Sequence, residues 1–304
     1  MELKTIPTEQ RNQDTLNIDE VGVLEILKMI NEEDQKAALC VKKHLDKIAV
    51  AVDAIAEKFA AGGRVVYSGA GNSGRAGIMD ASEWSPTFNV PEGRVVALMA
   101  GGAGATNQPI ESAEDNKEWG AKDLKDICFN KNDVLVGLAA SGRTPYVVGA
   151  VEYAKSLGAL TVSITCNEDL NSPLNSLVDY PIGIYAGPEA ITGSTRMKAG
   201  TVQKMVTNML STAIMVKAGK VYSNLMVNVQ TKNEKLRARA KSIIAEITNA
   251  ADNEIDEVLR LTNDDVSLSI LILLTGCKKQ EAESLMAESG GHIKKALSIY
   301  RTKN

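Results

Sequence analysis

The sequence predicts an α/β fold, in which helices cover both faces of a five-stranded parallel sheet and a small all-α domain follows. Short apolar runs alternate with helical patterns, and strands that alternate with helices form βαβ units with parallel strands. Each run is rich in β-branched residues and apolar almost throughout, which is typical of strands buried on both faces of a sheet. The five runs are residues 64–70, 94–101, 133–140, 160–166 and 180–187.

The stretch before the first strand predicts an arm and two helices. Residues 1–17 are polar, contain Pro7 and read as an extended arm. Helical patterns follow over about residues 19–31 and 34–61, where apolar residues recur at helical spacing. Gly62-Gly63 ends the second pattern, because glycine favours the end of a helix over its interior.

Helices are also predicted between and after the strands. After the last strand, residues 196–219 read as a long apolar helix and residues 228–248 as a charged helix. Residues 250–304 contain three or four short amphipathic patterns separated by Gly or Asn. We therefore expect two domains, residues 1–235 with the sheet and residues 236–304 with helices alone. Between the strands, helical patterns occupy about residues 74–84, 111–127, 145–157 and 170–177.

Composition argues against several classes of function. The chain has 304 residues, a net charge of −4 and 4% aromatic residues. An acidic chain with few aromatics is unsuited to nucleic acid, which is bound by basic surfaces and by stacking on aromatic rings. The N-terminus has no apolar targeting segment, and no run of 18 apolar residues occurs. Neither a signal peptide nor a membrane span is therefore expected.

Cysteines and histidines are few and dispersed. The four cysteines form no CxxC pair, as is usual for thiols in a reducing cytoplasm, where we expect the protein to be located. His44 and His292 are the only histidines, and neither has neighbours at a metal-ligand spacing. The sequence therefore offers little material for a zinc site or a Ser-His-Asp triad, and no bound metal is expected.

The loop after the first strand reads YSGAGNSGR over residues 67–75 and contains the spacing G-x-G-x-x-G. This spacing is typical of dinucleotide sites, but those also need an acidic residue at the end of the second strand. Residues 98–102 read LMAGG and supply none. Asn72 and Ser73 instead offer side-chain donors where a helix begins, and a helix N-terminus favours an anion. The loop therefore favours one phosphate monoester over NAD.

Turns with small hydroxyl residues recur later in the chain. Residues 140–145 read ASGRTP, where Pro145 suits the first turn of a helix, and residues 192–196 read TGSTR before the long apolar helix. Because the carboxyl ends of parallel strands meet at one edge of a sheet, we expect these turns to share one crevice. The binding residues expected there are Gly71, Asn72, Ser73, Ser141, Gly142, Arg143, Thr144, Ser194, Thr195, Arg196 and Lys198.

These motifs resemble those of phosphosugar-binding proteins. GAGNSGR and ASGRTP, each between a strand and a helix, resemble the sugar isomerase (SIS) domain. Over residues 5–245 the chain closely resembles the N-acetylmuramic acid 6-phosphate etherase family, and it does so more weakly beyond. The resemblance implies an SIS-type three-layer sandwich. The stretches that carry it include TEQRNQDTLNID, GAGNSGRAGIMDASE, AASGRTPYVVGAVEYAKSLGA, TGSTRMKAGTVQK and GKVYSNLMVNVQTKNEKL.

The resemblance also implies a reaction. The family cleaves the ether between D-lactate and C3 of a 6-phosphorylated amino sugar, giving N-acetylglucosamine 6-phosphate and D-lactate in cell-wall sugar recycling. Elimination from the ring-opened sugar, followed by addition of water, needs a base at C2 and an acid at the ether oxygen. It needs no metal or organic cofactor.

The family's two catalytic glutamates are carried by the motifs DASE and SAED, which implies Glu83 as the acid and Glu114 as the base. The reverse assignment stays open, because the second half of the reaction reverses the proton transfers. Arg196 and Lys198, in TGSTRMKAG, would neutralise the phosphate or the lactate carboxylate.

SIS proteins commonly complete a site with a second subunit, so the resemblance also implies a homodimer. The helices at residues 34–61 and 200–217 are the interface we expect. Two other functions stay open. A non-catalytic phosphosugar sensor would keep the phosphate loops but need not keep the glutamates. An SIS aldose–ketose isomerase would share proton removal at C2 without an acid at a C3 ether.

Overall fold

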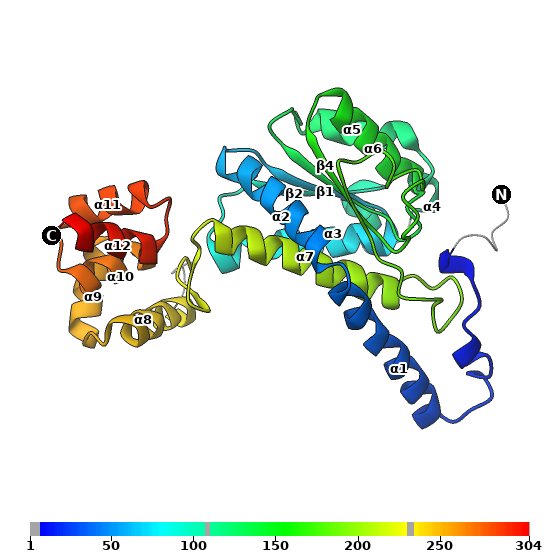
Figure 1. The fold of residues 1–304 in the computed structure, drawn as a ribbon, viewed down its shortest axis with the longest axis horizontal. Coiled ribbons are helices and arrows are strands. Elements are labelled where there is room, and N and C mark those ends of the chain that lie inside the picture. Colours follow the sequence, from blue (N-terminus) through cyan, green and yellow to red (C-terminus); the bar gives the residue numbers. More distant parts are fainter. Residues whose placement is uncertain (1–6, 107–109, 230–233, 304) are drawn as a thin grey trace. The chain divides into compact units, whose positions relative to one another are not determined.

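The chain forms two compact units. Unit 1 contains Met1–Ala81 and Gly93–Ser211, and unit 2 contains Ser82–Glu92 and Thr212–Asn304. The boundary expected from the sequence, after residue 235, falls inside unit 2 and stays a prediction. The structure, a computed structural model, describes residues 7–106, 110–229 and 234–303 (Figure 1).

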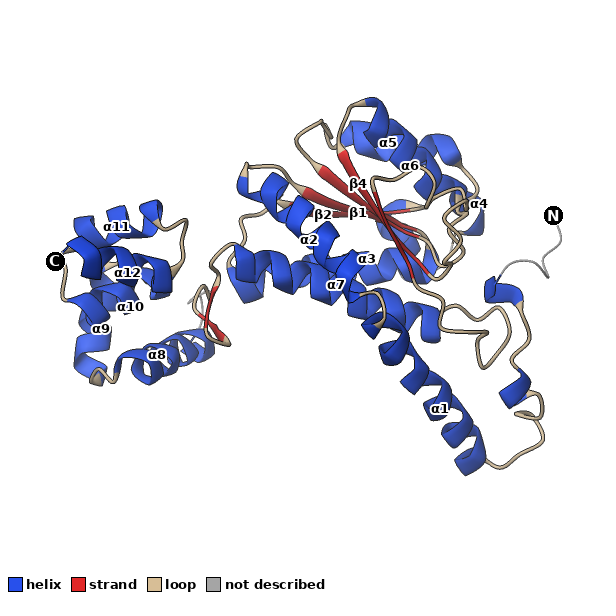
Figure 2. Cartoon of the chain, in the orientation of Figure 1, coloured by secondary structure: helices blue, strands red, loops and turns tan. Residues whose placement is uncertain are grey.

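Unit 1 is built on a sheet of five parallel strands in the order β2-β1-β3-β4-β5 (Figure 2), so the predicted sheet is confirmed. Strands β1 and β3 are buried along their whole length, as their apolar sequences predict. The strand order reverses beside β1, which lies between β2 and β3, and ligand crevices form at such a switch point. The strands are β1 Val65–Gly69, β2 Val95–Met99, β3 Val134–Leu138, β4 Leu160–Thr165 and β5 Tyr180–Gly183.

Helices cover both faces of this sheet. In Figure 1, α5 and α6 lie over one face, and α2, α3 and α7 lie over the other, which gives three layers. In the described part of the chain, short 3-10 turns also occur at Pro7–Glu9, Gln13–Thr15 and Gly102–Thr106. The helices are α1 Val23–Lys42, α2 Leu45–Ala60, α3 Gly71–Phe88, α4 Glu111–Glu114, α5 Lys117–Asp126, α6 Pro145–Ser156 and α7 Lys198–Lys217.

Three helix predictions differ from the structure. The pattern at 111–127 is interrupted at Asp115 and Asn116, between α4 and α5. The break predicted between the patterns at 19–31 and 34–61 falls inside α1. In the structure the break lies at Lys43 and His44, between α1 and α2. Residues 170–177 form turns and bends instead of a helix. There Asn175 Nδ2 donates to the backbone oxygen of Asn167 at 2.9 Å. Asn and Asp side chains that bond the backbone in this way compete with helix formation.

A buried carboxylate joins helices α3 and α7 to the sheet. Asp80, on α3, is 2% exposed. Its two oxygens accept hydrogen bonds from Tyr67 Oη on β1, at 2.8 Å, and from Ser211 Oγ on α7, at 3.0 Å. Buried polar groups that are paired in this way fix the elements that carry them. The position of α3, which begins at the phosphate loop, is therefore set by β1 and α7 together.

Glycine allows α5 and α6 to approach closely. A Cβ atom at Gly120 would lie 1.9 Å from the backbone oxygen of Tyr146. We expect Gly120→Ala to lower the free energy of unfolding by about 2 kcal/mol, because overpacking costs roughly 1–3 kcal/mol and backbone atoms cannot rotate away. The opposing gain in helix propensity is at most about 1 kcal/mol.

Urea denaturation followed by circular dichroism measures this loss. Gly22→Ala is the matched control, because nothing lies within 4 Å of a Cβ atom at Gly22. Its effect should stay below about 1 kcal/mol, the scale of a change at a helix N-cap. Equal midpoints for the two variants would contradict the close approach of α5 and α6.

Unit 2 is mainly helical, which confirms the helical region expected near the C-terminus. Buried apolar residues such as Ile255, Ile270 and Ile293 form its core. Asp265 begins α10 by accepting a hydrogen bond from Leu268 N at 2.9 Å. No helix in the described part of the chain is long and apolar enough to cross a membrane. The elements are β6 Val221–Tyr222, β7 Leu225–Met226, α8 Glu234–Thr248, α9 Asp252–Leu261, α10 Val266–Thr275, α11 Lys279–Glu288 and α12 Ile293–Lys303.

Candidate active site

The turns after β1 and β3 lie side by side, because these strands are neighbours and Gly69 pairs with Leu138 at their carboxyl ends. Each turn leads into a helix N-terminus, α3 or α6. With other segments of unit 1 the turns line a polar cavity of about 270 Å³. Six of the eleven predicted binding residues line it, and so does Glu114. The lining residues are Thr8, Glu9, Ala70, Gly71, Asn72, Ser73, Glu114, Ala140, Ser141, Thr144, Gly193 and Thr195.

The first turn exposes the start of α3 to this cavity. Gly71 has a φ of 51°, in the left-handed region that favours glycine. Ser73 is 8% exposed, and its hydroxyl donates to Gln203 Oε1 at 2.9 Å. Because the first N–H groups of a helix have no partner within it, the start of α3 can donate to an anion in the cavity.

Glu114 reaches the cavity from the end of the short helix α4. Its side chain is half-buried. A Cβ atom at Gly71 would lie 3.0 Å from Glu114 Oε1, so the carboxylate rests against the phosphate-loop backbone. Glycine at position 71 therefore serves two needs, the left-handed turn and the room for this carboxylate.

The second turn presents Ser141 and Thr144 at the start of α6. Thr144 is the N-cap residue, and Pro145 takes the first helical position, as predicted. Gly142 and Arg143 do not line the cavity. Gly142 has a φ of 71°, and a Cβ atom there would lie 3.0 Å from Ser172 Oγ, so it packs against the loop after β4.

The start of α7 is already occupied by a carboxylate. Glu189, 2% exposed, accepts hydrogen bonds from the backbone N–H groups of Lys198 and Ala199, each at 2.9 Å. Burial raises the pKa of Glu189, and the two backbone donors offset part of that rise. Because Glu189 accepts from these two donors, they are not available to an anion in the cavity. Of the binding residues predicted in the third turn, only Thr195 lines the cavity.

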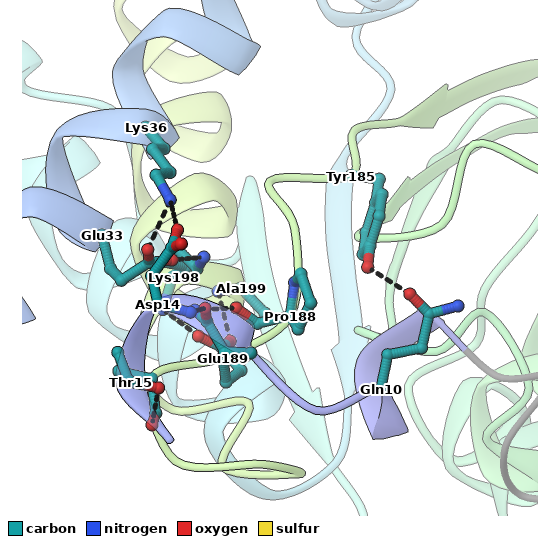
Figure 3. A network of polar contacts seen from close by, with 12 residues as sticks. Gln10, Asp14, Thr15, Glu33, Lys36, Tyr185, Pro188, Glu189, Lys198 and Ala199 are labelled. Carbon is teal, nitrogen blue, oxygen red and sulfur yellow. Dashed lines mark hydrogen bonds and ion pairs between the residues drawn. The ribbon is translucent and has the colours of Figure 1, made fainter. Parts of the chain in front are cut away.

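Lys198 is buried in an ion pair (Figure 3) and does not line the cavity. Lys198 and Glu33 are each 2% exposed, and the Lys198 ammonium bonds the Glu33 carboxylate. Lys36 contacts the same carboxylate and also Asp14 Oδ2, at 2.9 Å. Burial alone would raise the pKa of Glu33, but the hydrogen bonds from both lysines hold it below its usual value. Lys198 therefore joins α7 to α1, and Arg196 and Ser194 also lie outside the lining.

Removing Lys198 should destabilise the fold strongly. Lys198→Met leaves Glu33 buried without its main partner, and breaking a buried pair typically costs about 3–5 kcal/mol. The lowered pKa of Glu33 adds stability above its unfolded pKa and loses it as pH falls through the folded value. The difference between variant and wild type should therefore shrink in acid.

Urea midpoints at pH 7 and pH 4 measure this difference. A Glu33→Gln/Lys198→Met double variant is the control, because it leaves no unpaired buried charge and should recover part of the loss. Equal stability of Lys198→Met and wild type at pH 7 would show that the pair contributes nothing.

The N-terminal arm supplies two lining residues that the sequence did not single out, Thr8 and Glu9. The arm is fastened to the segment after β5. Thr15 Oγ1 donates to the backbone oxygen of Ala190 at 2.9 Å, and Tyr185 Oη donates to Gln10 Oε1 at 3.0 Å (Figure 3). The only sequence signal for this role is the motif TEQRNQDTLNID, which resembles the family's arm.

Glu83 does not line the cavity. It is exposed on α3, twelve residues beyond Gly71. At 1.5 Å per residue this places it about 18 Å along the helix axis from the phosphate loop. One chain therefore brings only one of the two predicted catalytic carboxylates to the cavity wall. Among the described residues, no group of three or more His, Cys, Asp or Glu is arranged to hold a metal ion.

Comparison with known proteins identifies the family. The SIS domain family matches residues 117–213, which confirms the SIS-type fold, and the N-terminal SIS domain of glucokinase regulatory protein matches residues 47–155. Proteins named N-acetylmuramic acid 6-phosphate etherase match almost the whole chain. Those from Clostridium botulinum (strain Loch Maree) and Actinobacillus pleuropneumoniae are 51% and 50% identical over 97% of this chain, covering 97% and 96% of their own.

A third such protein, from Caldanaerobacter subterraneus, is 48% identical over 98% of this chain and 97% of its own. Identity near one half over the full length is far beyond what a shared fold alone produces. It covers the phosphate turns, the arm and the helical C-terminal region together. The chain belongs to the N-acetylmuramic acid 6-phosphate etherase family.

Proposed function

We propose that this protein cleaves the D-lactyl ether of N-acetylmuramic acid 6-phosphate, giving N-acetylglucosamine 6-phosphate and D-lactate. The observation that carries the proposal is the polar cavity between the starts of α3 and α6, with Glu114 in its wall. Such a cavity suits a phosphate monoester, and the carboxylate beside it suits proton transfer.

The phosphate is held by neutral donors. Residues at the starts of α3 and α6 line the cavity, and so do three residues with hydroxyl groups, Ser141, Thr144 and Thr195. Lys198 is engaged with Glu33, so it contributes no charge to the phosphate. Helix N-termini carry a partial positive charge, which compensates for the missing cation.

The chemistry proceeds by elimination. Opening of the sugar ring makes C1 an aldehyde, which acidifies the proton at C2. Glu114 takes this proton, the C3–O bond breaks, and Glu83 protonates the departing lactate oxygen. Water then adds to C3 of the resulting double bond, and a proton returns to C2. Each acid or base role typically contributes about 10²- to 10⁴-fold in rate.

The activity is tested by incubating the purified protein with N-acetylmuramic acid 6-phosphate and measuring D-lactate with D-lactate dehydrogenase. Release of one lactate per sugar, without added nucleotide or metal, supports the proposal. Binding of the sugar phosphate with no release would favour a phosphosugar sensor, and conversion to a ketose phosphate would favour an isomerase.

We place the reaction in the cytoplasm, because all four cysteines are free thiols.

We further propose that the protein is a homodimer. The first half of α1 extends away from the sheet in Figure 1. It carries exposed apolar side chains. Val23, Leu24 and Leu27 are 72%, 69% and 57% exposed. They precede the helices at residues 34–61 and 200–217 that the sequence analysis expected at the interface, and that expectation stays a prediction. Clustered apolar side chains in water mark an interaction surface, and oligomers of identical chains are the commonest kind.

This interface predicts that Leu24→Glu/Leu27→Glu converts the dimer to a monomer, because two buried charges would face the partner. Sedimentation velocity measures the change in mass. Glu25→Gln, on the same turn, is the control and should remain a dimer, since it adds no charge to the apolar face. A wild-type monomer at all concentrations would contradict the proposal.

A further inference from the structure

The N-terminal arm, residues 7–15, forms one wall of the cavity. Thr8 is 5% exposed and lines the cavity with its neighbour Glu9. A Cβ atom at Gly193 would lie 3.1 Å from Glu9 Oε2, so the carboxylate rests against the turn before α7. Gly193 has a φ of 78°, and glycine there allows both the turn and the contact.

The arm is held in this position by specific bonds. Thr15 Oγ1 donates to the Ala190 oxygen at 2.9 Å, and Asn12 Nδ2 donates to the Pro188 oxygen at 3.0 Å. Thr15 and Asn12 are 5% and 6% exposed. Asp14 pairs with Lys36 at 2.9 Å and so connects the arm to α1 (Figure 3). The bonds of Thr15 and Asn12 join segments that lie about 175 residues apart in the chain, so the fold builds the arm into the cavity.

The chemistry of the lining leaves a specific task for Glu9. None of the described lining residues is Lys or Arg, and the two turns present hydroxyl and N–H donors that suit a phosphate. A sugar, in contrast, offers hydroxyl and amide N–H donors, which need acceptors. The two carboxylates of the lining, Glu9 and Glu114, are its strongest acceptors. Glu114 carries out proton transfer in the proposed reaction, so Glu9 remains as the fixed acceptor.

We propose that Glu9 is a substrate-binding residue whose carboxylate accepts hydrogen bonds from the hydroxyl and amide groups of the sugar. Asn12 and Thr15 are the positioning residues that hold it there. The identity of the sugar rests on the proposed function, whereas the division of the cavity into a donor side for phosphate and an acceptor side for the sugar does not.

The first test compares two ligands. Glu9→Gln keeps the volume of the side chain and removes its charge and one acceptor. It should lower the affinity for N-acetylglucosamine 6-phosphate by about 10- to 100-fold, the range for hydrogen bonds to a charged group. The affinity for inorganic phosphate should stay the same or increase, because a nearby negative charge is gone. Isothermal titration calorimetry, with phosphate as competitor where binding is weak, measures both.

Two further variants serve as controls. Thr144→Val, at the phosphate turn, should lower the affinity for both ligands. Glu20→Gln, an exposed carboxylate that does not line the cavity, should weaken neither. If Glu9→Gln weakens both ligands by the same factor, or leaves the sugar phosphate unaffected, the proposal is wrong.

The second test addresses the positioning residues. Thr15→Val removes the hydroxyl that bonds Ala190 and nearly preserves shape. It should lower sugar-phosphate affinity while leaving phosphate affinity unchanged, and add little to the effect of Glu9→Gln in the double variant, because both act through one contact. A merely structural role would lower thermal stability and give additive losses for both ligands, which would overturn the positioning role.

These binding measurements separate the inference from the proposed function. If the wild type releases no lactate but Glu9→Gln selectively loses the sugar phosphate, the activity is refuted and the role of Glu9 stands. If the wild type releases lactate and Glu9→Gln binds both ligands with wild-type affinity, the activity stands and the role of Glu9 is refuted.

Discussion

Replacing Glu114 by glutamine is expected to lower the rate of D-lactate release by about 10²- to 10⁴-fold. Glu114 lines the cavity with its carboxylate against Gly71, at the start of α3. In the proposed reaction this carboxylate takes the C2 proton, and an amide has no basic oxygen for that task. The affinity for N-acetylglucosamine 6-phosphate should stay close to that of the wild type, because the phosphate turns are intact.

Two measurements check this result. A coupled D-lactate assay gives the rate, and proton NMR in heavy water gives the exchange of the C2 proton of N-acetylglucosamine 6-phosphate. Both should collapse in Glu114→Gln. Glu118→Gln is the matched control, since Glu118 is exposed at the start of α5 and does not line the cavity. Wild-type exchange in Glu114→Gln would assign the base to another residue.

The sheet and the crevice could be predicted because their signals are local. A β-branched run predicts a strand wherever it lies, and a glycine turn before a helical pattern predicts a helix N-terminus with free N–H groups. Since β1 and β3 are neighbours, the turns at Asn72 and Ser141 meet without any further information. Five of the predicted residues that line the cavity lie in these two turns, and Thr195 comes from the turn before α7.

The positions of the predicted binding residues that do not line the cavity depend on partners far along the chain. Lys198 was expected to neutralise the phosphate or the lactate carboxylate, but its ammonium bonds Glu33, 165 residues away. Glu189 accepts from two backbone donors at the α7 N-terminus, so they are not available to an anion in the cavity. A buried charge must be paired, but nothing in the spacing of Glu33 and Lys198 says with what. The same holds for Glu9, whose arm is held at the cavity by bonds such as those of Asn12 and Thr15 to the segment after β5.

Glu83 is a different case, because helix geometry alone places it far from the loop. In a helix that starts at Gly71, residue 83 lies about 18 Å along the axis from the phosphate loop. This distance is far greater than that between C2 and the C3–O bond of the sugar. The family motif implies that Glu83 donates a proton to the lactate oxygen. In its own chain, however, α3 places Glu83 outside the lining of the cavity. A second copy of the chain, with its own α3, resolves this conflict if its Glu83 enters the site.

Replacing Glu83 by glutamine should therefore lower the rate of lactate release by about 10²- to 10⁴-fold and yet leave the exchange of the C2 proton unchanged. Loss of the acid blocks cleavage of the C3–O bond, whereas Glu114 still removes and returns the C2 proton. The NMR and lactate assays used for Glu114→Gln separate the two steps. Glu92→Gln, exposed in the same segment of unit 2, is the control and should be fully active.

Mixing the two inactive variants tests whether the acid and the base come from different copies. In a two-fold dimer each site then uses Glu114 of one chain and Glu83 of the other, so a mixed dimer keeps one intact site and doubles the defect in the other. After subunit exchange, half of the molecules are mixed, and activity should recover to about one quarter of the wild type. If exchange is complete and no activity returns, both carboxylates serve the same chain. Glu83 must then approach the sugar by a movement of its own segment.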